Sequence, residues 1–149
     1  MTYEPSSILL VEDEPAHAAL TQRAIRKSGN AGRIDIVTHG EAALDYLFNR
    51  GEYADKDRYS VPGLILLDIK LPGMDGIEVL KVIKEDPQLK RIPVIMLTTS
   101  EREVDIARSY EHYANSYLTK PVGVKAFEEK IRQLDSYWMI VNQPPVIVV

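Results

Sequence analysis

The sequence predicts an α/β fold with a doubly wound parallel sheet, for three reasons. Five short apolar runs alternate with segments in which apolar residues recur at helical spacing. One of these runs, residues 64–67, is apolar at every position, which is typical of a strand buried on both faces of a parallel sheet. The length of 149 residues fits one domain with a sizeable core.

The first half of the chain is predicted to hold two strand-helix units and a loop. Residues 8–11 form the first strand, and helical spacing follows it as far as Ile25. Residues 34–36 form the second strand, which also leads into a helix. The stretch 52–63 is polar and ends in a Pro-Gly pair, so we expect a surface loop of more than usual length.

The second half continues the alternation. A third strand runs into Asp68, and because a charge within so apolar a strand would be costly, Asp68 is expected at its end. The remaining predicted elements are strands over residues 92–100 and 115–120 and helices over residues 76–86, 102–113 and 124–141. This order predicts a five-stranded (βα)5 sheet with right-handed crossovers and a C-terminal extension.

Composition excludes several kinds of protein. The net charge is -4 and no basic cluster is present, so we expect no nucleic-acid partner. Cysteine is absent, which removes disulfides and thiolate metal sites. No apolar run approaches the ~20 residues of a membrane span, and the N-terminus lacks a signal-peptide pattern. We therefore expect a cytoplasmic protein without a membrane partner.

Polar residues follow four of the predicted strands. Because the carboxyl ends of parallel strands meet at one edge, where ligands bind in such sheets, we expect these side chains to lie together. They are Glu12 and Asp13 after the first strand, Asp68 after the third, Thr98 and Thr99 after the fourth, and Lys120 after the fifth.

This set of residue types suits phosphoryl transfer. Crowded carboxylates repel one another unless a cation intervenes, and hard oxygen ligands favour Mg²⁺. Lys120 and a threonine hydroxyl would stabilise charge on a phosphoryl group received by Asp68. Taken singly, each acidic residue is more typical of a helix N-cap, and Lys120 of an exposed lysine. The joint pattern, with one residue type on each strand, favours a site.

Four segments carry a family resemblance: "LLVEDEP", "LILLDIKLPGMDG", "IPVIMLTTS" and "SYLTKP". Together they resemble the receiver domain of two-component response regulators, which has a flavodoxin-like fold, over residues 7 to about 141. The resemblance implies that Asp68 is the phosphoacceptor. It implies Mg²⁺ bound directly by Asp13 and Asp68, through water by Glu12, and by the main-chain carbonyl of Lys70.

The resemblance also implies roles in phosphate binding and switching. Thr98, beside Thr99, matches the hydroxyl that moves toward the phosphoryl group, Tyr117 its aromatic partner, and Lys120 the phosphate-binding lysine. The Lys120-Pro121 peptide bond is expected to be cis, as is usual in the family. Two positions depart from the common pattern. Glu12 stands where many receivers have Asp, and Lys70 is often Asn or Met, so its ammonium group is expected to alter hydrolysis of the acyl phosphate.

The C-terminal segment predicts self-association. We divide the chain into a receiver domain, residues 1–141, and an arm, residues 142–149, that ends without an output domain. The arm combines two prolines with uncharged β-branched residues, which favour an extended, pairing segment over a frayed end. Candidates for a homodimer interface are Trp138, Pro144, Pro145, Val146 and Ile147.

The tail and the motifs are most similar to stand-alone response regulators of bacterial phytochrome histidine kinases. This implies a signalling protein, not an enzyme, that takes a phosphoryl group from a sensor histidine kinase. A chemotaxis-type or phosphorelay-intermediate receiver is the alternative. A dehalogenase-type phosphatase would need Asp in place of Lys70, and an FMN module would need a Gly-rich phosphate loop where this chain has "EDEPAHA". His17, His39 and His112 are interpreted as scattered surface or core residues.

Overall fold

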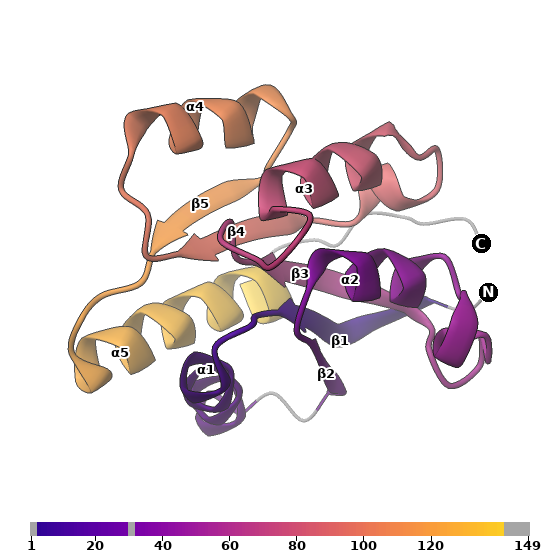
Figure 1. Ribbon diagram of the computed structural model, residues 1–149. Helices are drawn as coiled ribbons and strands as arrows, with labels where there is room; N and C mark the ends of the chain where they lie inside the picture. Colours follow the sequence, from indigo (N-terminus) through magenta and orange to yellow (C-terminus); the bar gives the residue numbers. More distant parts are fainter. Residues whose placement is uncertain (1–2, 30–31, 142–149) are drawn as a thin grey trace.

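The computed structural model describes residues 3–29 and 32–141, which form a parallel sheet of five strands between two helical layers (Figure 1). The strand order β2-β1-β3-β4-β5 confirms the flavodoxin-like, doubly wound fold. The strands are β1 (Tyr3–Val11), β2 (Ile34–Val37), β3 (Val61–Leu67), β4 (Val94–Thr98) and β5 (Ser116–Thr119). The α-helices are α1 (Pro15–Lys27), α2 (Gly40–Leu47), α3 (Gly76–Glu85), α4 (Glu103–Glu111) and α5 (Val124–Asp135).

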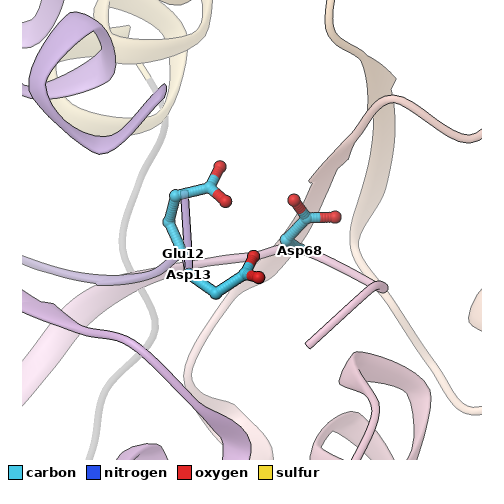
Figure 2. A group of neighbouring side chains, drawn as sticks. All are labelled: Glu12, Asp13 and Asp68. Carbon is cyan, nitrogen blue, oxygen red and sulfur yellow. The ribbon is translucent and has the colours of Figure 1, made fainter. Parts of the chain in front are cut away.

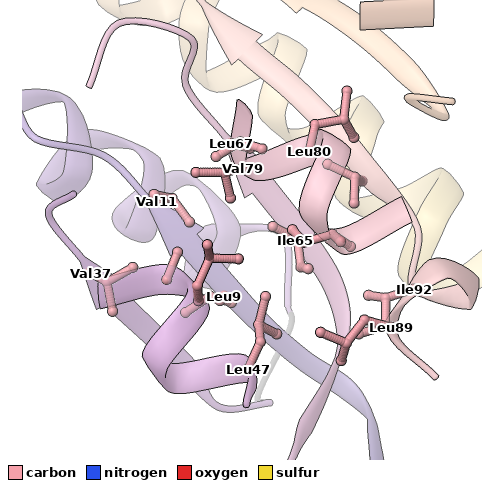
Figure 3. Close-up of a cluster of buried hydrophobic side chains, with 14 of the residues drawn as sticks. Leu9, Val11, Val37, Leu47, Ile65, Leu67, Val79, Leu80, Leu89 and Ile92 are labelled. Carbon is pink, nitrogen blue, oxygen red and sulfur yellow. The ribbon is translucent and has the colours of Figure 1, made fainter. Parts of the chain in front are cut away.

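The central strands are buried on both faces because successive side chains enter two different cores. Leu9 and Val11 of β1 pack under α2 and α3 with Ile65 and Leu67 of β3 (Figure 3). Their neighbours along each strand pack under α1 and α5 instead. This alternation explains why the central runs contain apolar residues at every position.

Local signals set several helix boundaries. Asp75 caps α3, and its carboxylate accepts a hydrogen bond from the Glu78 N–H at 2.9 Å. The same helix ends at Glu85, two residues before Pro87. His39 caps α2, because its Nδ1 accepts a hydrogen bond from the Ala42 N–H at 3.1 Å. The histidine is therefore structural, in agreement with its interpretation from the sequence.

The loop expected over residues 52–63 ends earlier than predicted. β3 begins at Val61, and it includes the Pro-Gly pair that was expected to end the surface loop. The pairing register between β1 and β3 shifts between Glu4 and Ile8, which leaves a bulge in β1. Gly63 faces this bulge, and a Cβ atom there would lie 1.9 Å from the carbonyl oxygen of Pro5. Glycine is thus needed because the two strands approach each other closely at this position.

The rest of this loop is built on aromatic packing. It contains a short 3-10 helix, η1 (Gly51–Tyr53), and the rings of Tyr46, Tyr53 and Tyr59 meet with centroids 5.0–5.5 Å apart. The side-chain amide of Asn49 donates to the carbonyl oxygens of Tyr53 and Tyr59 at 3.1 and 2.9 Å. These contacts account for an ordered loop that sequence polarity alone does not predict.

The C-terminal helix also differs from the expected single helix over residues 124–141. α5 ends at Asp135, and the chain continues as a π-helix, η3 (Ser136–Val141). Trp138 is half-buried and packs against the core beneath α1 and α5, with the Tyr137 ring 5.4 Å away. The proposed arm, including Pro144, Pro145, Val146 and Ile147, lies outside the described residues. None of the helices within the described ranges has the length and apolar character to cross a membrane.

The close approach at Gly63 predicts a large loss of stability when a side chain is added. We expect Gly63→Ala to lower the free energy of unfolding by about 3 kcal/mol or more, because β1 or β3 must move. Gly123→Ala is the control, since no atom lies within 4 Å of its built Cβ, and we expect a loss below about 1 kcal/mol. Urea denaturation of both variants measures the difference. Equal losses would contradict the role assigned to the β1 bulge.

Candidate functional site

Three carboxylates gather at the carboxyl edge of the two central strands. Glu12 and Asp13 directly follow β1, Asp68 directly follows β3, and the two strands pair in register up to Val11 and Leu67. One carboxylate oxygen from each acidic residue lies within 4.8 Å of the others. Figure 2 shows the three carboxylates converging on one space from the two strands. The parallel pairing of β1 with β3 therefore determines this cluster.

The three carboxylates differ in exposure. Glu12 and Asp68 are buried, with 2% and 7% of their surface exposed, whereas Asp13 is exposed. Burial raises the pKa of Glu12, because a charge is less stable away from water, and the nearby Lys120 partly opposes this effect. The Glu12 carboxylate also accepts a hydrogen bond from the Glu14 N–H at 3.2 Å.

Lys120 connects the buried carboxylates. Its ammonium group is buried and donates to Asp68 Oδ2 at 3.0 Å and to Glu12 Oε1. The lysine directly follows β5. Its backbone N–H donates to the Thr98 carbonyl at 2.7 Å, which fixes the backbone beside β4. A third partner is the Nδ1 of His17, 3.2 Å from the ammonium nitrogen.

The segment after Asp68 is held close to the Asp68 backbone by a second glycine contact. A Cβ atom on Gly76 would lie 1.9 Å from the Asp68 carbonyl oxygen, so α3 can begin here only with glycine. The Gly76 N–H donates to the Ile69 carbonyl at 2.8 Å. The Lys70 N–H lies 3.4 Å from Asp68 Oδ1, and the Lys70 side chain is exposed.

The threonines and Tyr117 meet at the loop after β4. Thr98 is fully buried and accepts a hydrogen bond from the Ser100 N–H at 3.3 Å, while Thr99 is exposed. The Tyr117 hydroxyl donates to the Ser100 carbonyl at 2.9 Å. Burial raises the pKa of Tyr117, which keeps this hydroxyl protonated as a donor. The buried Ser100 hydroxyl donates in turn to Asp105 of α4 at 2.7 Å.

Two features of the site differ from the sequence analysis. No peptide bond within residues 3–29 and 32–141 is cis, so the expectation of a cis Lys120-Pro121 bond is wrong. The trans form of such bonds is intrinsically favoured, and nothing in the sequence forces the alternative. Secondly, Ser100, Asp105 and His17 belong to the surroundings of the site, although the sequence analysis singled out neither Ser100 nor Asp105 and assigned His17 no role there. The placement of His17 in the first turn of α1, four residues after Asp13, was the available signal.

The residues present fit a divalent cation. Three carboxylates and one ammonium group give a charge of -3 + 1 = -2, which one Mg²⁺ would balance. Carboxylate oxygens are suitable ligands for Mg²⁺, which also retains water molecules in such sites. Asp13 is exposed, and one of its carboxylate oxygens lies within 4.8 Å of an oxygen of the buried Asp68, so a hydrated ion can approach both from the side of Asp13.

Comparison with known proteins identifies the family. The profile of the response regulator receiver domain matches residues 8–132. The chain belongs to the response regulator receiver family. A "Probable methanogenesis regulatory protein FilR2" of Methanothrix harundinacea is 42% identical over 95% of this chain and 89% of the relative. Response regulator Rcp1 of a Synechocystis strain is 44% identical over 91% of this chain and 90% of the relative.

Solved structures of receivers agree with this assignment. The phosphorylated cyanobacterial phytochrome response regulator RcpA superposes with a TM-score of 0.89 at 41% identity, covering 94% of this chain and 98% of RcpA. The Mn²⁺-bound form of Rcp1 gives a TM-score of 0.87 at 41% identity and covers 94% of this chain and 99% of Rcp1. Receivers bind Mg²⁺ at an acidic pocket, and the Glu12, Asp13 and Asp68 cluster of this receiver is such a pocket.

The raised pKa of Glu12 predicts pH-dependent metal binding. Because burial holds this pKa above the ordinary 4.5, a proton competes with Mg²⁺ at higher pH than it would at an exposed glutamate. We expect Mg²⁺ affinity to fall as the pH is lowered from neutrality toward 4.5, the ordinary pKa of an exposed glutamate. Glu12→Gln should bind Mg²⁺ more weakly at the upper pH but lose less affinity across this range. Isothermal titration with MgCl2 at several pH values measures how the Mg²⁺ affinity of the parent and of Glu12→Gln changes with pH. An equal change in both proteins would contradict the effect assigned to Glu12.

Proposed function

We propose that this receiver accepts a phosphoryl group on Asp68 from a sensor histidine kinase. The observation that carries the proposal is the contact of the Asp68 carboxylate with the buried ammonium group of Lys120, beside two further carboxylates. This arrangement combines a nucleophile, a cation for the phosphoryl oxygens and an acidic metal pocket. The chain would act as a signalling phosphoacceptor in the cytoplasm, where kinases have access to ATP, and not as an enzyme with a free substrate.

The transfer step is a displacement at phosphorus. A carboxylate oxygen of Asp68 attacks the phosphorus of a phosphohistidine, the P–N bond breaks, and its electron pair remains on the imidazole. Lys120 exchanges its bond to Asp68 Oδ2 for a phosphoryl oxygen, and the Thr98 hydroxyl donates to another. Mg²⁺, when bound, neutralises charge on the carboxylates and the phosphoryl oxygens. Asp13, Asp68 and the Lys70 carbonyl would hold it directly, and Glu12 through water.

The same residues would pass the signal to α4. Movement of the Thr98 hydroxyl toward the phosphoryl group breaks its bond with the Ser100 N–H, and Tyr117 holds the carbonyl of the same serine. The residues that α4 buries are both polar, Asp105 and Ser109, so this helix has little apolar anchoring. A rearrangement of the loop after β4 would therefore shift α4 and the surface that it shares with β5.

A kinase helix would approach α1 and the loop after Lys120. A groove of about 560 Å³ lies there, lined partly by His17, Leu20, Val122 and Phe127. We propose a bacterial phytochrome as the kinase. Three solved relatives at 41% identity, RcpA, RtBRR and AtBRR, are phytochrome or bacteriophytochrome response regulators, which supports this choice over other stimuli.

The function is tested on Asp68 itself. Incubation with acetyl phosphate and Mg²⁺ is expected to add one phosphoryl group to the parent chain, and Asp68→Asn is expected to lose this addition because the amide is not a nucleophile. Intact mass spectrometry measures the product, with and without Mg²⁺. The control is Asp57→Asn, a change at an exposed aspartate in the loop before β3. Labelling of Asp68→Asn at the parent rate would rule out Asp68 as the acceptor.

We also propose that the receiver forms a homodimer through its C-terminal arm, residues 142–149. The support is the uncharged, β-branched sequence "VIVV" after two prolines, which favours pairing with a second chain. Trp138 is a further interface candidate, because it remains half-buried within one chain. The assignment of residues 1–141 as the receiver domain and 142–149 as the arm stays part of this proposal.

The dimer is tested by removing and by charging the arm. Sedimentation velocity of the complete chain is expected to give a dimer, and of a chain ending at Val141 a monomer, because the pairing segment is lost. Val146→Lys keeps the length but adds a charge to the segment, and should also shift the equilibrium toward the monomer. A truncated chain that sediments as the parent does would contradict a role for the arm.

A further inference from the structure

His17 contacts the lysine at the centre of the site from a different element. It lies in the first turn of α1, and its Nδ1 is 3.2 Å from the ammonium nitrogen of Lys120. An ammonium group has no lone pair, so the lysine donates and the imidazole Nδ1 accepts. The same Nδ1 is 3.9 Å from Glu12 Oε1, which is too far for a hydrogen bond.

We propose that His17 is a positioning residue that holds the ammonium group of Lys120 for phosphoryl transfer to Asp68. This inference rests on the proposed function of the site. His17 lies outside the acidic cluster and outside the strand ends. It would act through Lys120 without touching the phosphoryl group.

The number of partners around Lys120 supports this role. An ammonium group has three N–H donors, and the three acceptors around this one are Glu12, Asp68 and His17. When the phosphoryl group arrives, Lys120 must release Asp68 Oδ2 and turn to a phosphoryl oxygen. Glu12 and His17 would then hold the other two N–H groups. The ammonium group would therefore keep two hydrogen bonds while it turns, whereas without His17 it would keep only the one to Glu12.

The charge of the site explains why a neutral acceptor suits this position. A carboxylate in place of His17 would add a negative charge to a pocket that already holds three carboxylates, and would repel the phosphodonor. An aliphatic side chain would leave one N–H of a buried ammonium group without a partner. A neutral imidazole nitrogen avoids both effects and leaves the positive charge of Lys120 available to the phosphoryl oxygens.

The half-exposed ring also borders the groove described above. His17 has 41% of its side chain exposed and lines the groove together with Lys120, Thr99 and Val122. A phosphodonor that enters from this side therefore passes the imidazole next to Lys120. This location distinguishes His17 from His39, whose Nδ1 caps α2.

Two variants of His17 distinguish the effect of its hydrogen bond with Lys120 from the effect of the space that its side chain fills. His17→Asn keeps an acceptor oxygen close to the position of Nδ1, and His17→Leu fills a similar space without an acceptor. Each is labelled with acetyl phosphate at saturating Mg²⁺ over a range of donor concentrations, and the half-life of the acyl phosphate is followed by intact mass. We expect His17→Leu to lower the maximal labelling rate by about five- to tenfold and His17→Asn to recover most of it.

The controls identify a merely structural effect. Mg²⁺ affinity of the two variants should match that of the parent, and thermal unfolding should show that both variants are folded at the labelling temperature. A change confined to the maximal labelling rate then points to Lys120. Equal labelling rates for parent and His17→Leu, or equal losses in both variants, would overturn the proposal. If the parent itself is not labelled while Mg²⁺ binds, the proposed function fails, and this outcome is distinct from a failure of the role of His17.

Discussion

The buried ammonium group of Lys120 is the contact on which the site depends. Glu12 and Asp68 are two acidic groups in a space largely closed to water, and without a cation their burial would be strongly unfavourable. One ammonium group compensates only part of the charge, since Asp13 adds a third carboxylate at the rim. The residual negative charge gives the site its affinity for Mg²⁺ and keeps Lys120 directed toward Asp68.

The sheet makes this unfavourable concentration of charge possible. β1 and β3 are anchored by side chains in two apolar cores, so their carboxyl ends cannot move apart to relieve repulsion between Glu12 and Asp68. Gly76 allows α3 to begin directly against the Asp68 backbone. The apolar packing of β1 and β3 thus holds the carboxylates at the strand ends in place.

The opposite side of the site is built differently. α4 buries two polar residues, and Ser100 connects it to Tyr117 and Thr98 through single hydrogen bonds. Such contacts can be exchanged at little cost, whereas the two apolar cores resist rearrangement. The molecule therefore combines one half, around β1 and β3, that is held by apolar packing with another half, around β4 and α4, that is held mainly by exchangeable hydrogen bonds.

The sequence by itself determined the fold class and the residues at the strand ends. Fully apolar runs require burial on both faces, and the positions of Glu12, Asp68 and Lys120 follow from where those runs end. The tertiary structure decided the contacts between segments that are distant in the chain. Gly63 was placed in the surface loop because its role depends on the bulge of β1, which only strand pairing reveals. His17 was assigned no role from its place four residues after Asp13, because its importance comes from Lys120, more than a hundred residues away in the chain. Only the packing of α1 beside the end of β5 brings the two residues together.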